Sequence, residues 1–592
     1  MRTWLLTTIL LFSLSLTGAY GQSAGSGPEL HAPVEFPMRL SGNFGELRSG
    51  HFHAGIDIKT QGVTGKPIHA IADGHVSRIK VSATGYGHAL YIHHPQHGLT
   101  SVYAHLKSFA PELDEHVKNK QYKQKNFEIQ LFPEKGQFRV KRGEIIGYSG
   151  NTGSSQGPHL HFETRDLNRQ EPLNPLRFNW NIPDHIPPKI FNVALYPLGP
   201  NARVDGQTGK KFLDVAAINK NRFKVLGEAV PKVHGKVGFA IRAFDFLDGA
   251  PNWCGLYTLK MYVDSVLMYH HRMDRFSFYE TRYINSLIDY EEKVENSHSY
   301  QKTFREPNNQ LDIYEYLRNN GVCEFRDDSL HTITFRATDA QGNSSELYVK
   351  VKGQRQVSAS AGNPQSPRKK EVNGGNPVKV MPYAKSNSFK RADIRLQFPK
   401  NAFYDTVRFE YSKDTIARES GQFYSDLHHI HRRHTPVHKK FSLSIEAREL
   451  PDMLREKAFI ARVDEEENTY EYAGGEPVNG FISTQTRSFG KYAIMVDQKP
   501  PTIKPFVINE QKISFKIDDH LSGVDSYNGY INGQWVLFEY DPKNNLLFYR
   551  VDTSRLKKSE SYNLELYVSD AMNNVATYHE TIMMDMYQSH DN

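Results

Sequence analysis

Residues 150–163 read Gly-Asn-Thr-Gly-Ser-Ser-Gln-Gly-Pro-His-Leu-His-Phe-Glu, a glycine-rich run that ends in an alternating segment. The alternation in residues 159–163 predicts a β-strand, on which side chains two positions apart point the same way. His159 and His161 would then project from one face, while their apolar neighbours pack behind. Two imidazoles on one strand suit either a metal site with a catalytic neighbour or a strand end with two solvated histidines. This segment alone leaves both interpretations open.

A second group of candidate ligands lies upstream, in residues 51–58, which read His-Phe-His-Ala-Gly-Ile-Asp-Ile. If this segment is extended, the even separation places His53 and Asp57 on one face. Imidazole and carboxylate groups bind zinc, and three protein ligands leave a fourth position for water. His53, Asp57 and one of the later histidines would form such an open set. A third piece is Tyr-Ala-His-Leu at residues 103–106, whereas the helical His-Glu-x-x-His signature of the zincins is absent.

Together these pieces resemble the zinc endopeptidases of the lysostaphin and LytM type, peptidase family M23, which cut peptides in bacterial cell walls. The matching motifs lie in the family's order within residues 38–178. Besides the three segments above, they include residues 42–48, 74–87 and 141–147. One departure is the charged segment between Leu113 and Val140, which is longer than the family's usual connection. It would either form a wall of the substrate groove or merely decorate it.

The resemblance implies a role for five residues, all of which are present. His53, Asp57 and His161 would bind one Zn²⁺ per chain, and His105 and His159 would be catalytic. One catalytic histidine would accept a proton from the attacking water and the other would stabilise the developing oxyanion. The sequence does not assign these two tasks between them.

The same resemblance implies a secreted zinc metalloendopeptidase that hydrolyses peptide cross-links of bacterial peptidoglycan. Glycines 150, 153 and 157 would let an extended peptide approach closely. The alternative is a non-catalytic cell-wall-binding or amidase-regulating protein of the same fold, although no ligand has been lost here. A third hypothesis is hydrolysis of ordinary proteins. Which peptide bond would be cut is not written in the sequence.

Residues 1–21 have the pattern of a signal peptide. Arg2 supplies the positive end, residues 4–16 the apolar stretch, and Ala19 and Gly21 the small residues before the cleavage point. The apolar stretch is shorter than the roughly 18 residues of a spanning helix, and no later stretch qualifies. We therefore expect export to the periplasm, cell envelope or medium, with no transmembrane segment after processing. The net charge of +7 fits an anionic polymer or a merely solvated basic surface, and nothing resembles a nucleic-acid module.

The chain of 592 residues should hold several domains and be mainly β. We expect an antiparallel-sheet peptidase domain of the lysostaphin/LytM type, without a long helix, followed by immunoglobulin- or fibronectin-like β-sandwich domains. The expected segments are the peptidase domain at 29–180, an Ig-like β-domain with an insertion at 189–353, a flexible linker at 354–377, a β-rich domain at 378–495 and a second Ig-like β-domain at 496–592. The C-terminal β-domains could contact the cell wall or envelope, or inhibit the peptidase.

Two short motifs recur in the two Ig-like segments and make them resemble distant copies. The Asp-x-x-x-Gly run at residues 245–249 corresponds to residues 519–523. The turn Asp-Ala-Gln-Gly-Asn at residues 339–343 corresponds to Asp-Ala-Met-Asn-Asn at residues 570–574.

Three further features have more than one interpretation. Cys254 and Cys323 could pair in an oxidising compartment or remain two buried thiols. Residues 312–319 are a candidate helix in the insertion of the first Ig-like segment. The third feature is a cluster of five histidines: His428, His429, His431, His434 and His438. We interpret it as a solvated cationic loop rather than a second metal site, because no carboxylate lies at ligand spacing.

Overall fold

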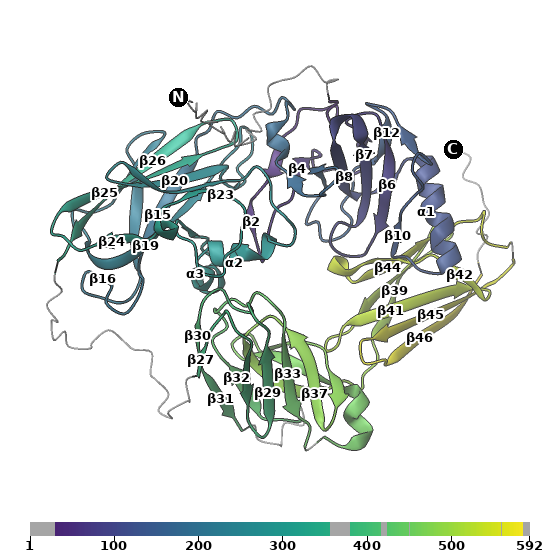
Figure 1. Ribbon diagram of the computed structural model, residues 1–592. Helices are drawn as coiled ribbons and strands as arrows, with labels where there is room; N and C mark the ends of the chain where they lie inside the picture. The colour runs from purple at the N-terminus through teal and green to yellow at the C-terminus, as the bar shows by residue number, and fades with distance from the viewer. Residues whose placement is uncertain (1–29, 356–378, 416–422, 449, 558, 584–592) are drawn as a thin grey trace, which may run out of the picture.

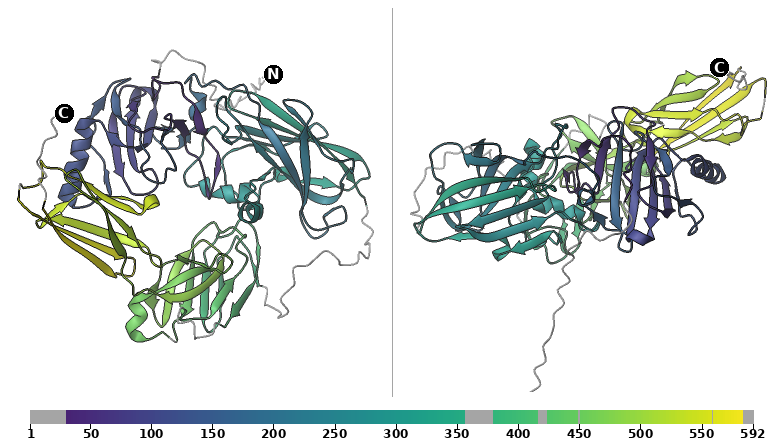
Figure 2. Two further views of the ribbon diagram at one scale, coloured as in Figure 1. Left: turned by 180° about the vertical axis from the view of Figure 1, so that it is seen from behind. Right: turned by 90° about the horizontal axis from the view of Figure 1, so that it is seen from above.

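The computed structural model describes residues 30–355, 379–415 and 423–583, apart from Glu449 and Lys558. The predicted signal peptide and residues 356–377 of the predicted linker lie outside the described residues. The chain is mainly β, as the sequence predicts. Four β-rich units follow one another around a ring (Figure 1), and the ring is also visible from behind (Figure 2). Within the described residues, no helix has the length and apolar character needed to cross a membrane.

The first unit contains a nine-stranded antiparallel sheet beside a three-stranded one. In spatial order, the large sheet comprises β1 (Leu40–Gly42), β4 (Ile56–Lys59), β13 (His159–Asp166), β8 (Leu99–Leu106), β7 (His88–His94), β6 (Gly74–Val81) and β10 (Ile129–Leu131), with β11 (Arg139–Val140) on β6 and β14 (Pro172–Leu173) on β13. The smaller sheet is β5 (Pro67–His69), β12 (Ile145–Tyr148) and β9 (Ser108–Phe109), and β2 (Leu47–Arg48) pairs with β3 (His51–Phe52). Alternate strand residues such as Ile56, Ile58, Leu160 and Phe162 are fully buried in one core. Because β13 lies between β4 and β8, this core holds three distant parts of the sequence in register.

A 14-residue helix interrupts the first unit, contrary to the expectation of no long helix. Helix α1 (Pro111–Gln124) starts with the proline that favours a first helical position and ends before left-handed Lys125. Its buried residues are Leu113, Val117 and Gln121, spaced four apart. The expectation was wrong because this buried stripe is narrow and includes a polar residue, so the sequence shows little helical periodicity.

The second unit is a twelve-stranded sheet network that runs from β15 to β26. Its strands are β15 (Lys189–Pro197), β16 (Arg203–Val204), β17 (Lys211–Ala217), β18 (Arg222–Val225), β19 (Lys232–Phe244), β20 (Thr258–Val263), β21 (Val266–Arg272), β22 (Gln301–Lys302), β23 (Tyr314–Leu317), β24 (Cys323–Phe325), β25 (Leu330–Thr338) and β26 (Ser344–Gly353). The prediction of a helix at residues 312–319 was wrong, because β23 lies there and pairs with β21. The insertion contains the 3-10 helix η3 (Thr281–Tyr283) and the α-helices α2 (Ile284–Leu287) and α3 (Tyr290–Asn296). Cys254 and Cys323 are free, buried thiols.

The third and fourth units each consist mainly of two antiparallel sheets around one apolar core. The third contains β28 (Asn387–Lys390), β29 (Ile394–Phe398), β33 (Phe441–Glu446), β37 (Phe481–Thr486) and β36 (Glu476–Val478) in one sheet, β31 (Tyr411–Asp414), β32 (Leu427–Ile430), β38 (Gly490–Val496), β34 (Ala458–Asp464) and β35 (Thr469–Tyr472) in the other, and the pair β27 (Lys379–Met381) and β30 (Val407–Phe409). The fourth contains β39 (Thr502–Ile508), β40 (Lys512–Asp518), β44 (Leu546–Arg550) and β43 (Glu539–Asp541) against β42 (Gln534–Val536), β41 (Val524–Ile531), β45 (Tyr562–Asp570) and β46 (Val575–Ile582).

The histidine cluster of the third unit does not form the solvated loop that the sequence predicts. His428 is 1 % exposed within β32, and its Nδ1 lies 2.9 Å from the hydroxyl of Tyr411. His438 stacks on Tyr283 of the second unit, with 4.1 Å between ring centroids. The partners of these histidines are distant in sequence, so local spacing could not predict them.

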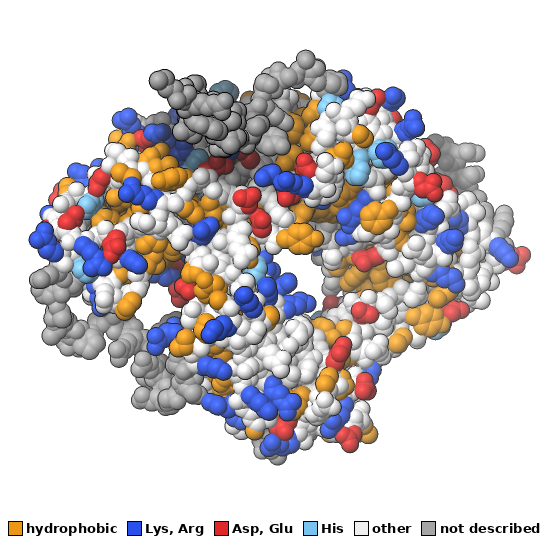
Figure 3. All heavy atoms as spheres, viewed as in Figure 1, with side chains coloured by type: hydrophobic (Ala, Val, Ile, Leu, Met, Phe, Trp, Pro, Cys, Tyr) orange, Lys and Arg blue, Asp and Glu red, His pale blue; other side chains and the backbone are white. Residues whose placement is uncertain are grey.

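Contacts between the first and fourth units close the ring. Lys118 of α1 forms an ion pair of 2.9 Å with Asp552, and Glu115 of α1 one of 2.6 Å with Arg555. The charged segment that was expected to line or decorate a groove thus also binds the fourth unit. In the space-filling view, Lys and Arg side chains gather beside the central opening (Figure 3).

Candidate metal centre

Strand pairing brings the three predicted ligands together. His161 of β13 lies directly opposite Asp57 of β4. His53 reaches them from the connection between β3 and β4, so the expected continuous extended segment was wrong, although the side chains still meet. Gly55 in this connection permits the close approach, because a Cβ atom there would lie 2.3 Å from the carbonyl oxygen of Phe162.

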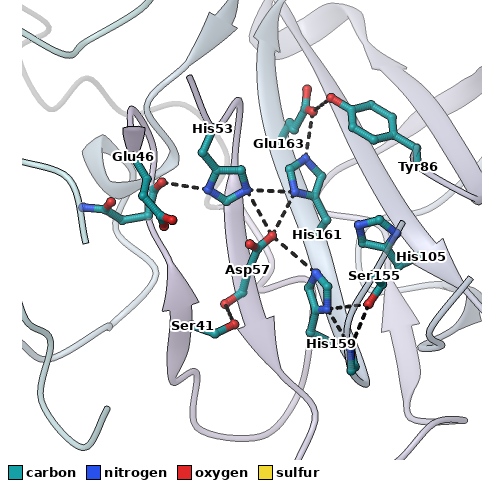
Figure 4. A network of polar contacts seen from close by, with 12 residues as sticks. Ser41, Glu46, His53, Asp57, Tyr86, His105, Ser155, His159, His161 and Glu163 are labelled. Atoms are coloured by element: carbon teal, nitrogen blue, oxygen red, sulfur yellow. Dashed lines mark hydrogen bonds and ion pairs between the residues drawn. The ribbon is translucent and has the colours of Figure 1, made fainter. Parts of the chain in front are cut away.

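One atom of each side chain points to a common centre (Figure 4). His53 Nε2 lies 3.0 Å from Asp57 Oδ1 and 3.0 Å from His161 Nδ1, and His161 Nδ1 lies 2.9 Å from Asp57 Oδ1. In a tetrahedral zinc site with bonds of about 2.0–2.1 Å, ligand atoms are about 3.3 Å apart. Small shifts would therefore let these three atoms hold one ion, and the imidazole and carboxylate donors fit zinc.

The outward-facing nitrogen of each histidine has a partner of its own. His53 Nδ1 donates to the carbonyl oxygen of Asn43 at 2.7 Å, and His161 Nε2 donates to Glu163 Oε1 at 2.8 Å. Such partners fix the imidazole so that its other nitrogen can bind a metal. The Asn43 side chain in turn pairs with the backbone of Gly255 in the second unit, at 2.7 and 2.8 Å. The second unit thus supports one of the predicted ligands, His53, of the first unit.

Glu163 was missed by the sequence reasoning, although its position offered a signal. It follows His161 by two residues on β13, so it occupies the same face of the strand. Its carboxylate is completely buried and accepts hydrogen bonds from Arg165 Nε at 2.6 Å and from the hydroxyl of Tyr86. Burial raises the pKa of Glu163, but Arg165 and His161 outweigh this effect and lower it to about 2. Glu163 is therefore ionised at neutral pH and places a negative charge behind His161.

Asp57 carries the negative charge at the centre itself. Burial raises its pKa, but interactions with His53, His159 and His161, including a hydrogen bond from each, bring it well below the usual range. Its second oxygen, Oδ2, accepts a hydrogen bond from Arg48 at 2.5 Å. Burial lowers the pKa of His53 to about 4, so this imidazole is neutral and able to bind a metal at neutral pH. The site is thus prepared for a cation.

The two predicted catalytic histidines lie beside the ligands, with 4.8 Å between their ring centroids. His105 is set by a bulge, because the pairing of β7 with β8 shifts register next to it and its φ is +59°. Its Nδ1 donates to the carbonyl oxygen of Thr152 at 2.9 Å. His159 Nδ1 donates to the carbonyl oxygen of Gly157 at 2.9 Å, and its Nε2 lies 3.5 Å from Asp57 Oδ1. Burial lowers the pKa of His105 to about 3.

The glycines of the loop were expected to let an extended peptide approach closely. At Gly150 and Gly153 the neighbouring atoms belong to the chain itself. A Cβ at Gly150 would lie 2.3 Å from the backbone nitrogen of Lys107, and one at Gly153 2.4 Å from the carbonyl oxygen of Gly85. These glycines let the loop pack against this chain's own backbone. At Gly157 the space is open, because no described atom outside its chain neighbours lies within 4 Å of the place that a Cβ would take.

Residues 51–122 and 129–175 match the model of peptidase family M23. The first unit is an M23 peptidase domain. Residues 378–497, in the third unit, match the model of a Zu5-like domain.

The M23 domain is similar to parts of several curated proteins. The chain is 35 % identical over 143 residues to the DD-carboxypeptidase/endopeptidase Mpg of Neisseria meningitidis, covering 23 % of this chain and 26 % of the relative. It is 30 % identical over 165 residues to the peptidoglycan DD-endopeptidase ShyA of Vibrio cholerae, covering 26 % and 31 %. The chain thus spans only about a quarter to a third of these relatives.

Among solved structures, the chain is similar to the catalytic domain of the M23 protein EnpA from Enterococcus faecalis. The identity is 28 %, with 24 % of this chain and 94 % of that chain covered and a TM-score of 0.18. The catalytic domain of lysostaphin from Staphylococcus simulans is 23 % identical, with 24 % and 90 % covered and the same TM-score.

Proposed function

We propose that the M23 domain is a zinc endopeptidase that hydrolyses peptide cross-links of bacterial peptidoglycan. The observation that carries this proposal is the convergence of His53 Nε2, Asp57 Oδ1 and His161 Nδ1 on one point, with His105 and His159 next to it. These three atoms would hold one Zn²⁺. Bound there, zinc would act as a Lewis acid toward a peptide carbonyl and lower the pKa of water toward neutrality.

The side chains around the site would set the protonation and the orientation of His161. Without an ion, burial lowers the pKa of His161, but Asp57 and Glu163 outweigh burial and raise it to about 9. Zinc binding would therefore release a proton from His161. Glu163 would keep the imidazole in its orientation by accepting from Nε2, and Arg165 would balance the buried charge of Glu163.

The two remaining histidines would carry out proton transfer and charge stabilisation. His105 donates through Nδ1 to Thr152, which leaves its Nε2 able to accept a proton from water. His159 donates through Nδ1 to Gly157, which leaves its Nε2 on the side of Asp57. A histidine in this place can stabilise negative charge on the carbonyl oxygen when protonated. Because Nδ1 of each residue is held by a backbone carbonyl oxygen, either residue could serve as the base through its Nε2.

Peptidoglycan is the substrate we favour because two relatives of the M23 domain are named as a DD-carboxypeptidase/endopeptidase and a peptidoglycan DD-endopeptidase. The substrate would be met outside the cytoplasm, in agreement with the predicted signal peptide. Retention of all five site residues favours an enzyme over the non-catalytic wall-binding or amidase-regulating alternative.

The test is incubation of the zinc-loaded full chain with purified peptidoglycan and, separately, with casein, each with and without a chelator. We expect new peptide termini in peptidoglycan only, and none after the chelator, by mass spectrometry. Cleavage of casein alone would refute the substrate class. Zinc-bound protein that cuts neither polymer would favour the non-catalytic alternative.

A further inference from the structure

Three aspartates lie together where the chain passes from the M23 domain into the second unit. Asp184 lies in the connection before β15, Asp245 directly follows β19, and Asp339 begins the turn between β25 and β26. One carboxylate oxygen from each lies within 4.8 Å of the others. The residues are 7 %, 2 % and 1 % exposed.

Two of these carboxylates have buried oxygens without a partner. Asp184 Oδ2 and Asp245 Oδ1 form no hydrogen bond within the described part of the chain. Burying an unpaired charged oxygen is costly, and a protein compensates with a counter-ion or a proton. Burial, reinforced by the neighbouring aspartates, raises the pKa of Asp245 to about 9 and that of Asp184 to about 6. A bound cation would balance the charge of the two unpartnered oxygens, Asp184 Oδ2 and Asp245 Oδ1.

The third aspartate is fixed by its turn. Asp339 Oδ1 accepts hydrogen bonds from three successive backbone amides, those of residues 341–343, at 2.7–3.0 Å. The Asn343 side chain donates both to Asp339 Oδ2 at 2.8 Å and to the carbonyl oxygen of Asp184 at 3.1 Å. The turn thus also holds the connection from the M23 domain, and it presents carboxylate oxygens to the cluster before any ion binds.

The fourth unit repeats this arrangement with one difference. Asp497, Asp519 and Asp570 form the corresponding set, and Asn574 donates to Asp570 and to the carbonyl oxygen of Asp497 as Asn343 does in the second unit. Here, however, Asp497 Oδ2 accepts hydrogen bonds from the backbone nitrogen and hydroxyl of Ser522, at 3.2 and 2.7 Å. The two copies of the repeat motifs therefore form two clusters of carboxylates. Hydrogen bonds from Ser522 reach the cluster of the fourth unit, whereas two oxygens of the cluster in the second unit have no hydrogen-bond partner within the described part of the chain.

We propose that Asp184, Asp245 and Asp339 bind a divalent cation of the calcium class, which fixes the joint between the M23 domain and the second unit. An all-oxygen set of carboxylates suits Ca²⁺, whereas zinc prefers nitrogen and sulfur ligands. The ion site is also linked to the metal centre through a short path of contacts. Asp245 pairs with Cys254 through two backbone hydrogen bonds, and the next residue, Gly255, binds the Asn43 side chain behind His53.

The test is calorimetric titration of the full chain with CaCl₂ in metal-depleted buffer, together with thermal unfolding. We expect saturable binding in the range of about 10⁻⁵–10⁻³ M. The unfolding midpoint should rise by about 5–10 °C at a Ca²⁺ concentration of about one hundred times the dissociation constant. The Asp245→Asn variant should bind Ca²⁺ at least about tenfold more weakly. Because asparagine has nearly the shape of a protonated aspartate, this variant should unfold no earlier than the wild type in the absence of Ca²⁺.

Two control variants make the same substitution elsewhere. Asp328→Asn changes an exposed aspartate just before β25, at the opposite end of that strand from Asp339, and Asp519→Asn changes the corresponding set of the fourth unit. Both should leave this Ca²⁺ affinity unchanged. Wild-type protein that shows neither heat of binding nor a shifted midpoint at about 10 mM Ca²⁺, well above the expected dissociation constant, would overturn the proposal. So would loss of binding in Asp519→Asn but not in Asp245→Asn, or equal losses in Asp245→Asn and Asp328→Asn.

Discussion

Replacing Glu163 with glutamine tests whether a residue that only orients a predicted ligand, His161, contributes to zinc binding. The change keeps the shape of the side chain but removes the negative charge behind His161. The pKa of Glu163, about 2, lies about two units below that of an ordinary glutamate, and each unit corresponds to about 1.4 kcal/mol. The ionised carboxylate therefore contributes about 3 kcal/mol at neutral pH. Because its pKa is lowered, this contribution is complete above about pH 4.3 and is lost as the pH falls through about 2.

We expect Glu163→Gln to destabilise the M23 domain by up to about 3 kcal/mol, because Arg165 is left buried without its counter-charge. Zinc affinity should fall by about 10- to 100-fold. The assays are urea unfolding and competition for zinc against a chromophoric chelator. Glu134→Gln, which changes an exposed glutamate in the same domain, is the control and should match the wild type. A Glu163→Gln protein with wild-type zinc affinity would refute the role of Glu163 in orienting His161.

Three further predictions concern contacts around the site and in the second unit. Asn43→Ala leaves two buried backbone groups of Gly255 unpaired, so urea unfolding should reveal a loss of about 2 kcal/mol or more; an unchanged midpoint would contradict this contact. Lys543 of the fourth unit donates hydrogen bonds to three carbonyl oxygens of the glycine-rich loop, so Lys543→Ala should speed amide hydrogen exchange in residues 151–157 without loss of zinc. Equal exchange in the variant and the wild type would show that the contact does not restrain the loop. Burial lowers the pKa of His271 to about 3, so the contribution of the neutral imidazole to the free energy of unfolding is complete above about pH 6.5 and falls by about 2 kcal/mol by pH 5. The stability of His271→Gln should therefore depend less on pH than that of the wild type, and parallel pH profiles of the two proteins would contradict the lowered pKa.

The sequence predicted which candidate site residues share one face of a regular strand. His159 and His161 alternate on β13, and the order of the motifs along the chain grouped them with Asp57. Strand alternation is a local rule, so a single segment is enough to apply it. The same rule would also have indicated Glu163, which shares the face of His161.

The sequence could not predict contacts that join distant segments. The support of His53 by Asn43 depends on Gly255, more than two hundred residues away. Helix α1 was missed because it buries only a narrow stripe, and residues 312–319 form a strand because β21 offers a pairing edge. In each case tertiary packing outweighs the local pattern.

The central claim is that one zinc ion held by His53, Asp57 and His161 serves a peptidase in which His105 takes part without binding the metal. The most direct measurement is zinc per chain together with peptide release from peptidoglycan, on the wild type, Asp57→Ala and His105→Ala. We expect about one zinc and release of fragments in the wild type, and neither in Asp57→Ala. His105→Ala should keep its zinc while its rate falls by about 10²- to 10⁴-fold. Full activity in His105→Ala, or full zinc content in Asp57→Ala, would contradict this account.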